Sequence, residues 1–161
     1  ERMNANDKKI FKEIKPITLD FNQKENFFFK EKDNYYGFGW SHNFSQLGIW
    51  SEGSTSTILF RTKNNFKGLK VEILCEPYIT KKNKILEFDV YVNNIFNKNI
   101  KLQSSQQDEK IEILINKEFV KNKDVKIDFN FKNLVSPYEV LESPDSRKLG
   151  ILAKNIEIFP I

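Results

Sequence analysis

The chain has 161 residues, of which 39% are hydrophobic, 14% aromatic and 30% charged, with a formal net charge of +4. This length predicts one compact domain with a sizeable core, and the abundance of phenylalanine favours a β-rich one. The positive charge is nearly all lysine, whereas bidentate recognition of bases and phosphates relies on arginine, here only Arg2, Arg61 and Arg147. The composition therefore argues against a nucleic-acid partner.

Residues 1–16 are polar and rich in lysine, with apolar side chains at Ile10, Phe11 and Ile14. A short amphipathic helix and a linker fit this pattern equally well, and Pro16 ends it. Residues 17–161 are predicted to form a single domain. The chain begins at Glu1 rather than at a methionine, and we interpret it as a piece of a longer protein.

From Ile17 onward, apolar and polar residues alternate repeatedly, which is typical of strands with one buried and one solvated face. Turn-forming asparagine, serine and lysine residues separate these runs, and no long helix is indicated. This arrangement of strands predicts an all-β fold, a two-layer antiparallel β-sandwich. Cys75, on one of the strands, is predicted to be a small core residue. The clearest runs are Ile17–Phe21, Leu69–Cys75, Leu86–Val92, Ile111–Ile115, Val125–Phe131 and Ile156–Ile158, and Asn26–Lys30 is a further short candidate strand.

The residues that most enzymes and metal sites need are scarce. His42 is the only histidine and Cys75 the only cysteine, so multi-histidine metal sites, thiolate clusters and an internal disulfide are excluded. Ser41 adjoins His42, but neighbouring residues on a strand point to opposite faces, which is a poor geometry for a catalytic pair. We therefore predict no catalytic residue, no metal ligand and no cofactor.

Acidic residues leave two alternatives open. Glu52, with one of Glu139, Glu142 or Asp145, could form the carboxyl pair of a small glycan hydrolase, whose members stand about 5 to 9.5 Å apart. The same acids could instead hold a structural calcium ion, which takes oxygen ligands from irregular loops. Acids in loops are more often simply solvated.

Two segments in fixed order resemble a known kind of domain. The first is "GFGWSHNFSQLGIWSEGSTSTILF" (Gly37–Phe60), the second is "NLVSPYEVLESPDSRKLGILAKNIEI" (Asn133–Ile158), and "VYVNN" (Val90–Asn94) lies between them. This order resembles the jelly-roll accessory domain of bacterial glycosyltransferases and related cell-envelope glycan enzymes, which is similar to carbohydrate-binding modules. Members usually carry a Pro-Glu pair between the two tryptophans, where this chain has His42-Asn43-Phe44-Ser45-Gln46.

The resemblance implies a jelly-roll, carbohydrate-binding-module-like domain that is not itself an enzyme. Its expected partners are a saccharide, such as a capsular or lipid-linked glycan, and a parent catalytic domain. Its expected location is the bacterial cell envelope or the cytoplasmic face of the membrane. A domain that packs on its parent without binding sugar remains the main alternative.

Sugars present apolar C–H faces and a ring of hydroxyl groups, so their sites combine aromatic faces with planar polar groups. The tryptophan-rich stretch offers both kinds of group close together. Each tryptophan could equally plug the end of the sandwich, and Arg147, beside Asp145, could clamp the C-terminal loop instead of meeting an anionic sugar. The predicted carbohydrate-binding residues are Tyr36, Trp40, His42, Asn43, Trp50, Glu52 and Arg147.

Overall fold

The structure is a computed structural model that describes residues 9, 18–19, 25–28, 37–41, 47–62, 66–103, 107–120 and 123–161. Apart from Lys9, the predicted linker or helix at residues 1–16 lies outside the described residues. Among the residues described, no helix is long and apolar enough to cross a membrane. The elements are β1 (Thr18–Leu19), β2 (Glu25–Phe28), β3 (Ile49–Glu52), β4 (Thr55–Thr62), β5 (Gly68–Pro77), β6 (Leu86–Val92), β7 (Ile95–Leu102), β8 (Glu109–Asn116), the short 3₁₀ helix η3 (Lys117–Phe119), β9 (Asp124–Phe131) and β10 (Leu149–Pro160).

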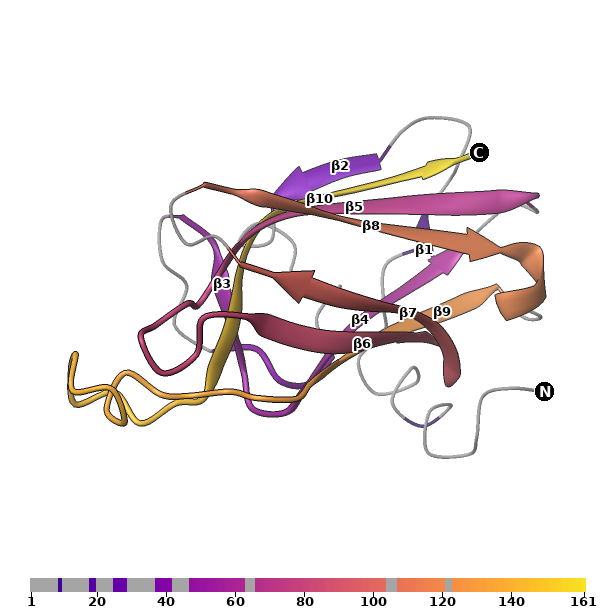
Figure 1. Cartoon of the computed structure of the whole chain (residues 1–161). Helices are drawn as coiled ribbons and strands as arrows, with labels where there is room; N and C mark the ends of the chain where they lie inside the picture. Colours follow the sequence, from indigo (N-terminus) through magenta and orange to yellow (C-terminus); the bar gives the residue numbers. More distant parts are fainter. Residues whose placement is uncertain are drawn as a thin grey trace.

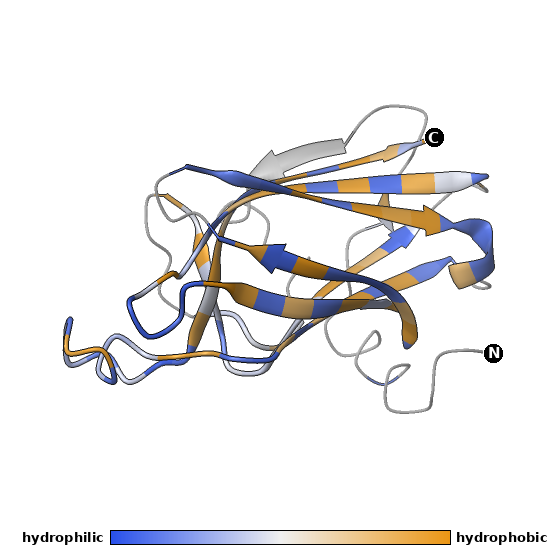
Figure 2. Ribbon diagram, viewed as in Figure 1, coloured by the Kyte–Doolittle hydropathy of each residue, from blue (hydrophilic) through white to orange (hydrophobic). Residues whose placement is uncertain are grey.

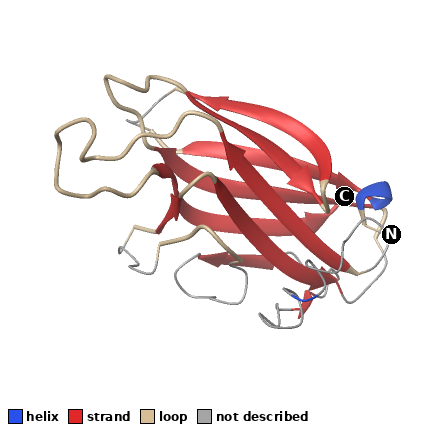
Figure 3. Ribbon diagram, turned by 90° about the horizontal axis from the view of Figure 1, so that it is seen from below, coloured by secondary structure: helices blue, strands red, loops and turns tan. Residues whose placement is uncertain are grey.

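The strands form two facing sheets (Figures 1 and 3). One sheet has the order β1-β4-β9-β6-β7, and the other has the order β2-β10-β5-β8, with β3 also paired to β10. Among the described strands, every pairing is antiparallel except that of β1 with β4, which is parallel. The predicted two-layer β-sandwich is confirmed.

The alternating runs, visible as bands of colour along the strands (Figure 2), bury their apolar positions between the two sheets. Phe60, Phe88 and Phe129 are among the largest fully buried side chains, and Phe88 packs edge to face on Phe129 with ring centroids 5.6 Å apart. Cys75 is fully buried, and burial raises the pKa of its thiol to about 12. The prediction of Cys75 as a small core residue is confirmed.

Strand β9 departs from the expected pattern of one buried and one solvated face. Lys126 and Asp128, predicted on the solvated face, are each only 8% exposed. Because β9 lies between β4 and β6 in the middle of its sheet, side chains of both neighbours flank them. The Lys126 ammonium lies 3.1 Å from an Asp128 carboxylate oxygen, so the two charges compensate each other. It also donates a hydrogen bond to the Asn94 side chain at 3.1 Å.

The turn between β6 and β7 consists of Asn93 and Asn94, with φ of 47° and 68°. Two residues with positive φ form the hairpin turn whose twist matches that of the flanking strands, and asparagine tolerates this conformation. The side chain of Asn93 is buried. Its amide donates to the carbonyls of Phe119 (3.0 Å) and Asp124 (3.1 Å), and its oxygen accepts from the Lys126 amide (2.8 Å). Asn93 thus ties this hairpin to the beginning of β9.

Replacing Asn93 with alanine is expected to lower the free energy of unfolding by about 2 to 4 kcal/mol, because three main-chain groups lose their partner. Urea denaturation followed by circular dichroism measures the change. Asn94→Gly is the comparison, since glycine suits a positive φ and the change removes the hydrogen bond that Asn94 accepts from Lys126, and it should cost about 1 kcal/mol. Equal losses in the two variants would show that the turn conformation, not the buried side chain, matters.

Candidate functional site

Segments far apart in sequence meet at one end of the sandwich. We call residues 37–41 and 49–53 the Trp corner, and residues 132–148, between β9 and β10, the C-terminal loop. The Ser41 amide donates to the Trp50 carbonyl (2.9 Å), and the Gly53 amide donates to the Lys148 carbonyl (2.9 Å). The Tyr78 amide, just after β5, donates to Gly150 (2.8 Å). Figure 1 shows β3, the β5–β6 connection and the C-terminal loop at this end.

Trp40 lies in the core at the base of this corner. Its side chain is 8% exposed, and its indole N–H donates to the Thr57 carbonyl at 2.8 Å. Gly39 before it has a φ of 81°, and a Cβ there would stand 1.9 Å from the Thr55 carbonyl oxygen. The glycine therefore lets the chain pass close to β4 and turn the indole inward. Trp40 has little ring surface to offer a ligand.

Trp50 is only half-buried and belongs to an aromatic pair. Its ring meets that of Tyr78 edge to face, with centroids 5.8 Å apart. The Tyr78 hydroxyl donates to a Glu142 carboxylate oxygen at 2.8 Å. Burial, and after it the hydrogen bond to Glu142, raises the pKa of Tyr78, so the phenol stays protonated at neutral pH. A partly exposed aromatic face and a carboxylate thus lie next to each other.

Arg147 makes the contacts expected of a clamp. Its Nε and Nη2 donate to the Asp145 carboxylate at 2.9 and 2.6 Å, and its Nη1 donates to the Ser41 hydroxyl at 2.7 Å. Ser41 is buried at 4% exposure. The hydrogen bond from Arg147 lowers the pKa of Asp145. The guanidinium therefore joins the C-terminal loop to the Trp corner.

This clamp predicts a dependence of stability on pH. Because the pKa of Asp145 is lowered in the folded state, its contribution is present above the unfolded value of about 3.9 and is lost as pH falls through the folded value. Asp145→Asn should therefore cost about 1 kcal/mol at pH 7. Its cost should shrink as pH falls from 7 to about 2. Thermal melts of both proteins across this range test the prediction, and a cost that does not change with pH would contradict it.

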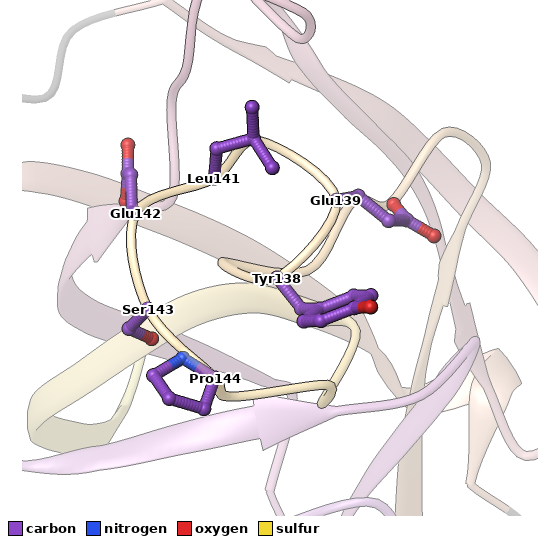
Figure 4. A pocket seen from close by; sticks show the side chains of 6 residues that line it. All are labelled: Tyr138, Glu139, Leu141, Glu142, Ser143 and Pro144. Carbon is purple, nitrogen blue, oxygen red and sulfur yellow. The ribbon is translucent and has the colours of Figure 1, made fainter.

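The C-terminal loop surrounds an open depression of about 550 Å³. Its lining combines apolar and polar groups, and Figure 4 shows Tyr138 and Pro144 on one side with Leu141 at the far rim. Tyr138 is 62% exposed and Leu141 is 93% exposed. Leu141 also has a φ of 62°, a left-handed conformation that leucine seldom adopts. The loop thus presents an aromatic ring and an aliphatic side chain to solvent.

Three of the four carboxylates of the hydrolase alternative are engaged with a partner. Glu139 pairs with Lys148, Asp145 with Arg147, and Glu142 accepts from Tyr78. The hydrogen bonds from the basic partners lower the pKa of Glu139 and Asp145. A glycosidase needs one carboxylic acid with a raised pKa to protonate the leaving group. The pKa values of Glu139 and Asp145 are shifted in the opposite direction, so neither carboxyl group suits the role of that acid.

The calcium alternative finds no support in the described ranges, where no group of three or more histidine, cysteine, aspartate or glutamate side chains could hold a metal ion.

The structure brings together three of the predicted carbohydrate-binding residues, Trp50, Glu52 and Arg147. Trp50 and Glu52 lie on β3, and the charge of Glu52 contributes to the raised pKa of Arg147. Tyr36, His42 and Asn43 lie outside the described residues, so their assignment stays a prediction. Sequence reasoning missed Tyr78 and Tyr138. Tyr138 lies within the motif "SPYEVLE", whereas nothing in the sequence marks Tyr78 as a neighbour of Trp50.

No protein-family model and no curated protein sequence matches the chain. Solved structures do share its fold. The carbohydrate-binding CBM36-1 domain of a multidomain xylanase from the hindgut metagenome of Trinervitermes trinervoides has a TM-score of 0.55 at 8% identity, covering 86% of this chain and 98% of that one. The carbohydrate-binding module CBM36 in complex with calcium and xylotriose has a TM-score of 0.51 at 7% identity, covering 83% and 98%.

The same sandwich also occurs in a different kind of protein. The insecticidal delta-endotoxin Cry8Ea1 from Bacillus thuringiensis has a TM-score of 0.59 at 9% identity, covering 89% of this chain but 25% of that one. At such low identities the likeness shows the fold alone. The chain therefore has the jelly-roll sandwich fold of carbohydrate-binding modules, and what it binds must be argued from its own residues.

Proposed function

We propose that this domain binds a saccharide without catalysing its conversion, at the surface formed by the Trp corner and the C-terminal loop. The observation that carries the proposal is the Trp50–Tyr78 pair beside Glu142. An aromatic face suits the apolar C–H face of a sugar ring, and a carboxylate accepts hydrogen bonds from its hydroxyls. The module-like fold supports the proposal, and the engaged carboxylates argue against hydrolysis.

Within the proposal, different residues have different roles. Trp50 supplies the stacking surface, and Tyr138, on the exposed rim, supplies a second ring. Glu52 and Arg147 lie at the edge of the same surface, with Arg147 also holding the loop in place. Trp40 supports the corner from within the core. Tyr36, His42 and Asn43 remain part of the proposed site on the strength of the sequence.

The wider context rests on the ordered motifs of the sequence. We propose that the domain is an accessory unit of a bacterial enzyme that makes or modifies a cell-envelope glycan, such as a glycosyltransferase, and that it contacts its parent catalytic domain. The saccharide would then be a capsular or lipid-linked glycan. The location implied is the cell envelope or the cytoplasmic face of the membrane.

Packing on a parent domain without sugar binding is the second candidate function. The exposed apolar side chains of Tyr138 and Leu141 favour it, because such surfaces often mark a missing partner. Both functions would use the same loop. They differ in what the isolated chain does with a free glycan.

A glycan array followed by calorimetric titration tests the proposal with the chain as it stands. We expect saturable binding to a restricted set of oligosaccharides and no release of reducing ends on prolonged incubation. A folded chain that binds nothing across neutral and charged glycans would refute sugar binding and leave the packing role. Cleavage of any bound glycan would instead refute the non-catalytic role.

A further inference from the structure

Three lysines gather beside the proposed site on the connection between β5 and β6, residues 78–85. Lys81, Lys82 and Lys84 are exposed. Lys82 donates to a main-chain carbonyl, that of Glu139 in the C-terminal loop, at 3.2 Å. Within the described part of the chain none of the three has a carboxylate at ion-pair distance. Their ammonium groups therefore face solvent without a direct ion pair.

The connection that carries these lysines is held in place. Thr80 and Asn83 exchange main-chain hydrogen bonds of 2.9 and 3.2 Å. The side chains of Asn83 and Asn133 bond to each other at 2.7 Å, and Asn83 also donates to the Asn133 carbonyl at 2.6 Å. Asn133 opens the C-terminal loop, and both loops extend from the same end of the sandwich (Figures 1 and 3). The main chain that carries the lysines is thus held against the C-terminal loop, which lines the depression shown in Figure 4.

Two of the three nearby acids are already neutralised by ion pairs within the C-terminal loop. Glu139 pairs with Lys148 and Asp145 with Arg147, while Glu142 accepts a hydrogen bond from Tyr78. Over residues 78–85 and 132–148 the chain carries six basic and three acidic side chains. One of the six, Lys132, is paired with Asp89 on β6. An excess of positive charge remains next to the aromatic and apolar groups of the site.

We infer that the saccharide is acidic, an inference that rests on the proposed function. Lys81 and Lys84 bind its anionic groups, and the rings of Trp50 and Tyr138 contact its sugar faces. Lysine ammonium groups attract carboxylate, sulfate and phosphate alike. The inference therefore concerns the anionic charge that these substituents share. Because the ammonium groups are exposed, their attraction for the ligand is screened by salt.

A panel of matched glycans tests this inference. Each acidic member is paired with a neutral counterpart of the same backbone: oligogalacturonate with its methyl ester, and sulfated and phosphorylated oligosaccharides with their unsubstituted forms. We expect an acidic member to bind at least about tenfold more tightly than its neutral counterpart, and we expect this advantage to fall between low and high salt. The matched pair in which the acidic member binds more tightly identifies the anionic group that the domain recognises.

Two double variants locate the effect. Lys81→Gln/Lys84→Gln should weaken binding of the acidic member about tenfold. The control, Lys67→Gln/Lys117→Gln, removes the same charge at the far end of β5, about 30 Å away, and should leave it unchanged. Equal affinity for acidic and neutral members, or equal losses in the two variants, would overturn the inference and leave sugar binding intact. Binding to no member at all would refute the proposed function itself.

Discussion

Replacing Trp50 with alanine is expected to weaken glycan binding about 30-fold, equivalent to about 2 kcal/mol, while the domain stays folded. Trp50 is half-buried, and its ring meets Tyr78 edge to face at 5.8 Å. Truncation therefore removes the stacking surface and leaves Tyr78 without its ring contact. Calorimetric titration with the best-binding array glycan measures the change in affinity.

The matched control for this variant is Trp50→Phe, which keeps an aromatic ring and should recover most of the affinity. Circular dichroism confirms that each protein is folded before titration. If Trp50→Ala binds as tightly as the unaltered chain, the aromatic pair does not contact the sugar and the proposed site is wrong. A loss of the same size in Trp50→Phe would indicate that the indole ring itself is needed.

Replacing Trp40 with alanine is expected to lower the free energy of unfolding by about 3 to 5 kcal/mol, the cost of emptying a large core position. Trp40 is 8% exposed, and its indole N–H bonds to the Thr57 carbonyl. The loss should appear as a lower midpoint in urea denaturation. At a temperature where the variant remains folded, its affinity for glycan should change far less than that of Trp50→Ala.

Tyr138→Ala serves as the control for stability, because Tyr138 is 62% exposed and its removal leaves no core cavity. It should change the free energy of unfolding by less than about 0.5 kcal/mol. A Trp40→Ala variant that is as stable as the unaltered chain, but has lost its affinity for glycan, would assign Trp40 to the binding surface and contradict the core role.

The sheets were predictable from the sequence where each strand has one buried face. Strand β5 follows this rule, with Leu69, Val71, Ile73 and Cys75 all buried. Strand β7 was missed because it is an edge strand whose buried apolar residues are confined to its end, at Ile100 and Leu102. Which strands pair could not be predicted either, because the parallel pairing of β1 with β4 depends on the whole chain and not on the local sequence pattern.

The candidate site was predictable only in part, for a related reason. The concentration of aromatic residues marked the Trp corner, but the direction of each ring depends on contacts distant in sequence. Trp40 turns inward to Thr57, and Trp50 meets Tyr78 instead. The bond of Arg147 to Ser41 spans 106 residues. The lysines of the β5–β6 connection lie beside the C-terminal loop through contacts such as the bond between Asn83 and Asn133, which are 50 residues apart.

The most direct measurement follows the two indole N–H signals of the ¹⁵N-labelled chain by nuclear magnetic resonance during a glycan titration. The chain has two tryptophans, so the two signals can be assigned with one Trp→Phe variant. Because Trp50 faces the proposed site and Trp40 bonds to Thr57 within the core, the Trp50 signal should shift progressively to saturation while the Trp40 signal stays nearly still. A glycan that saturates the chain yet leaves Trp50 unmoved would contradict this assignment.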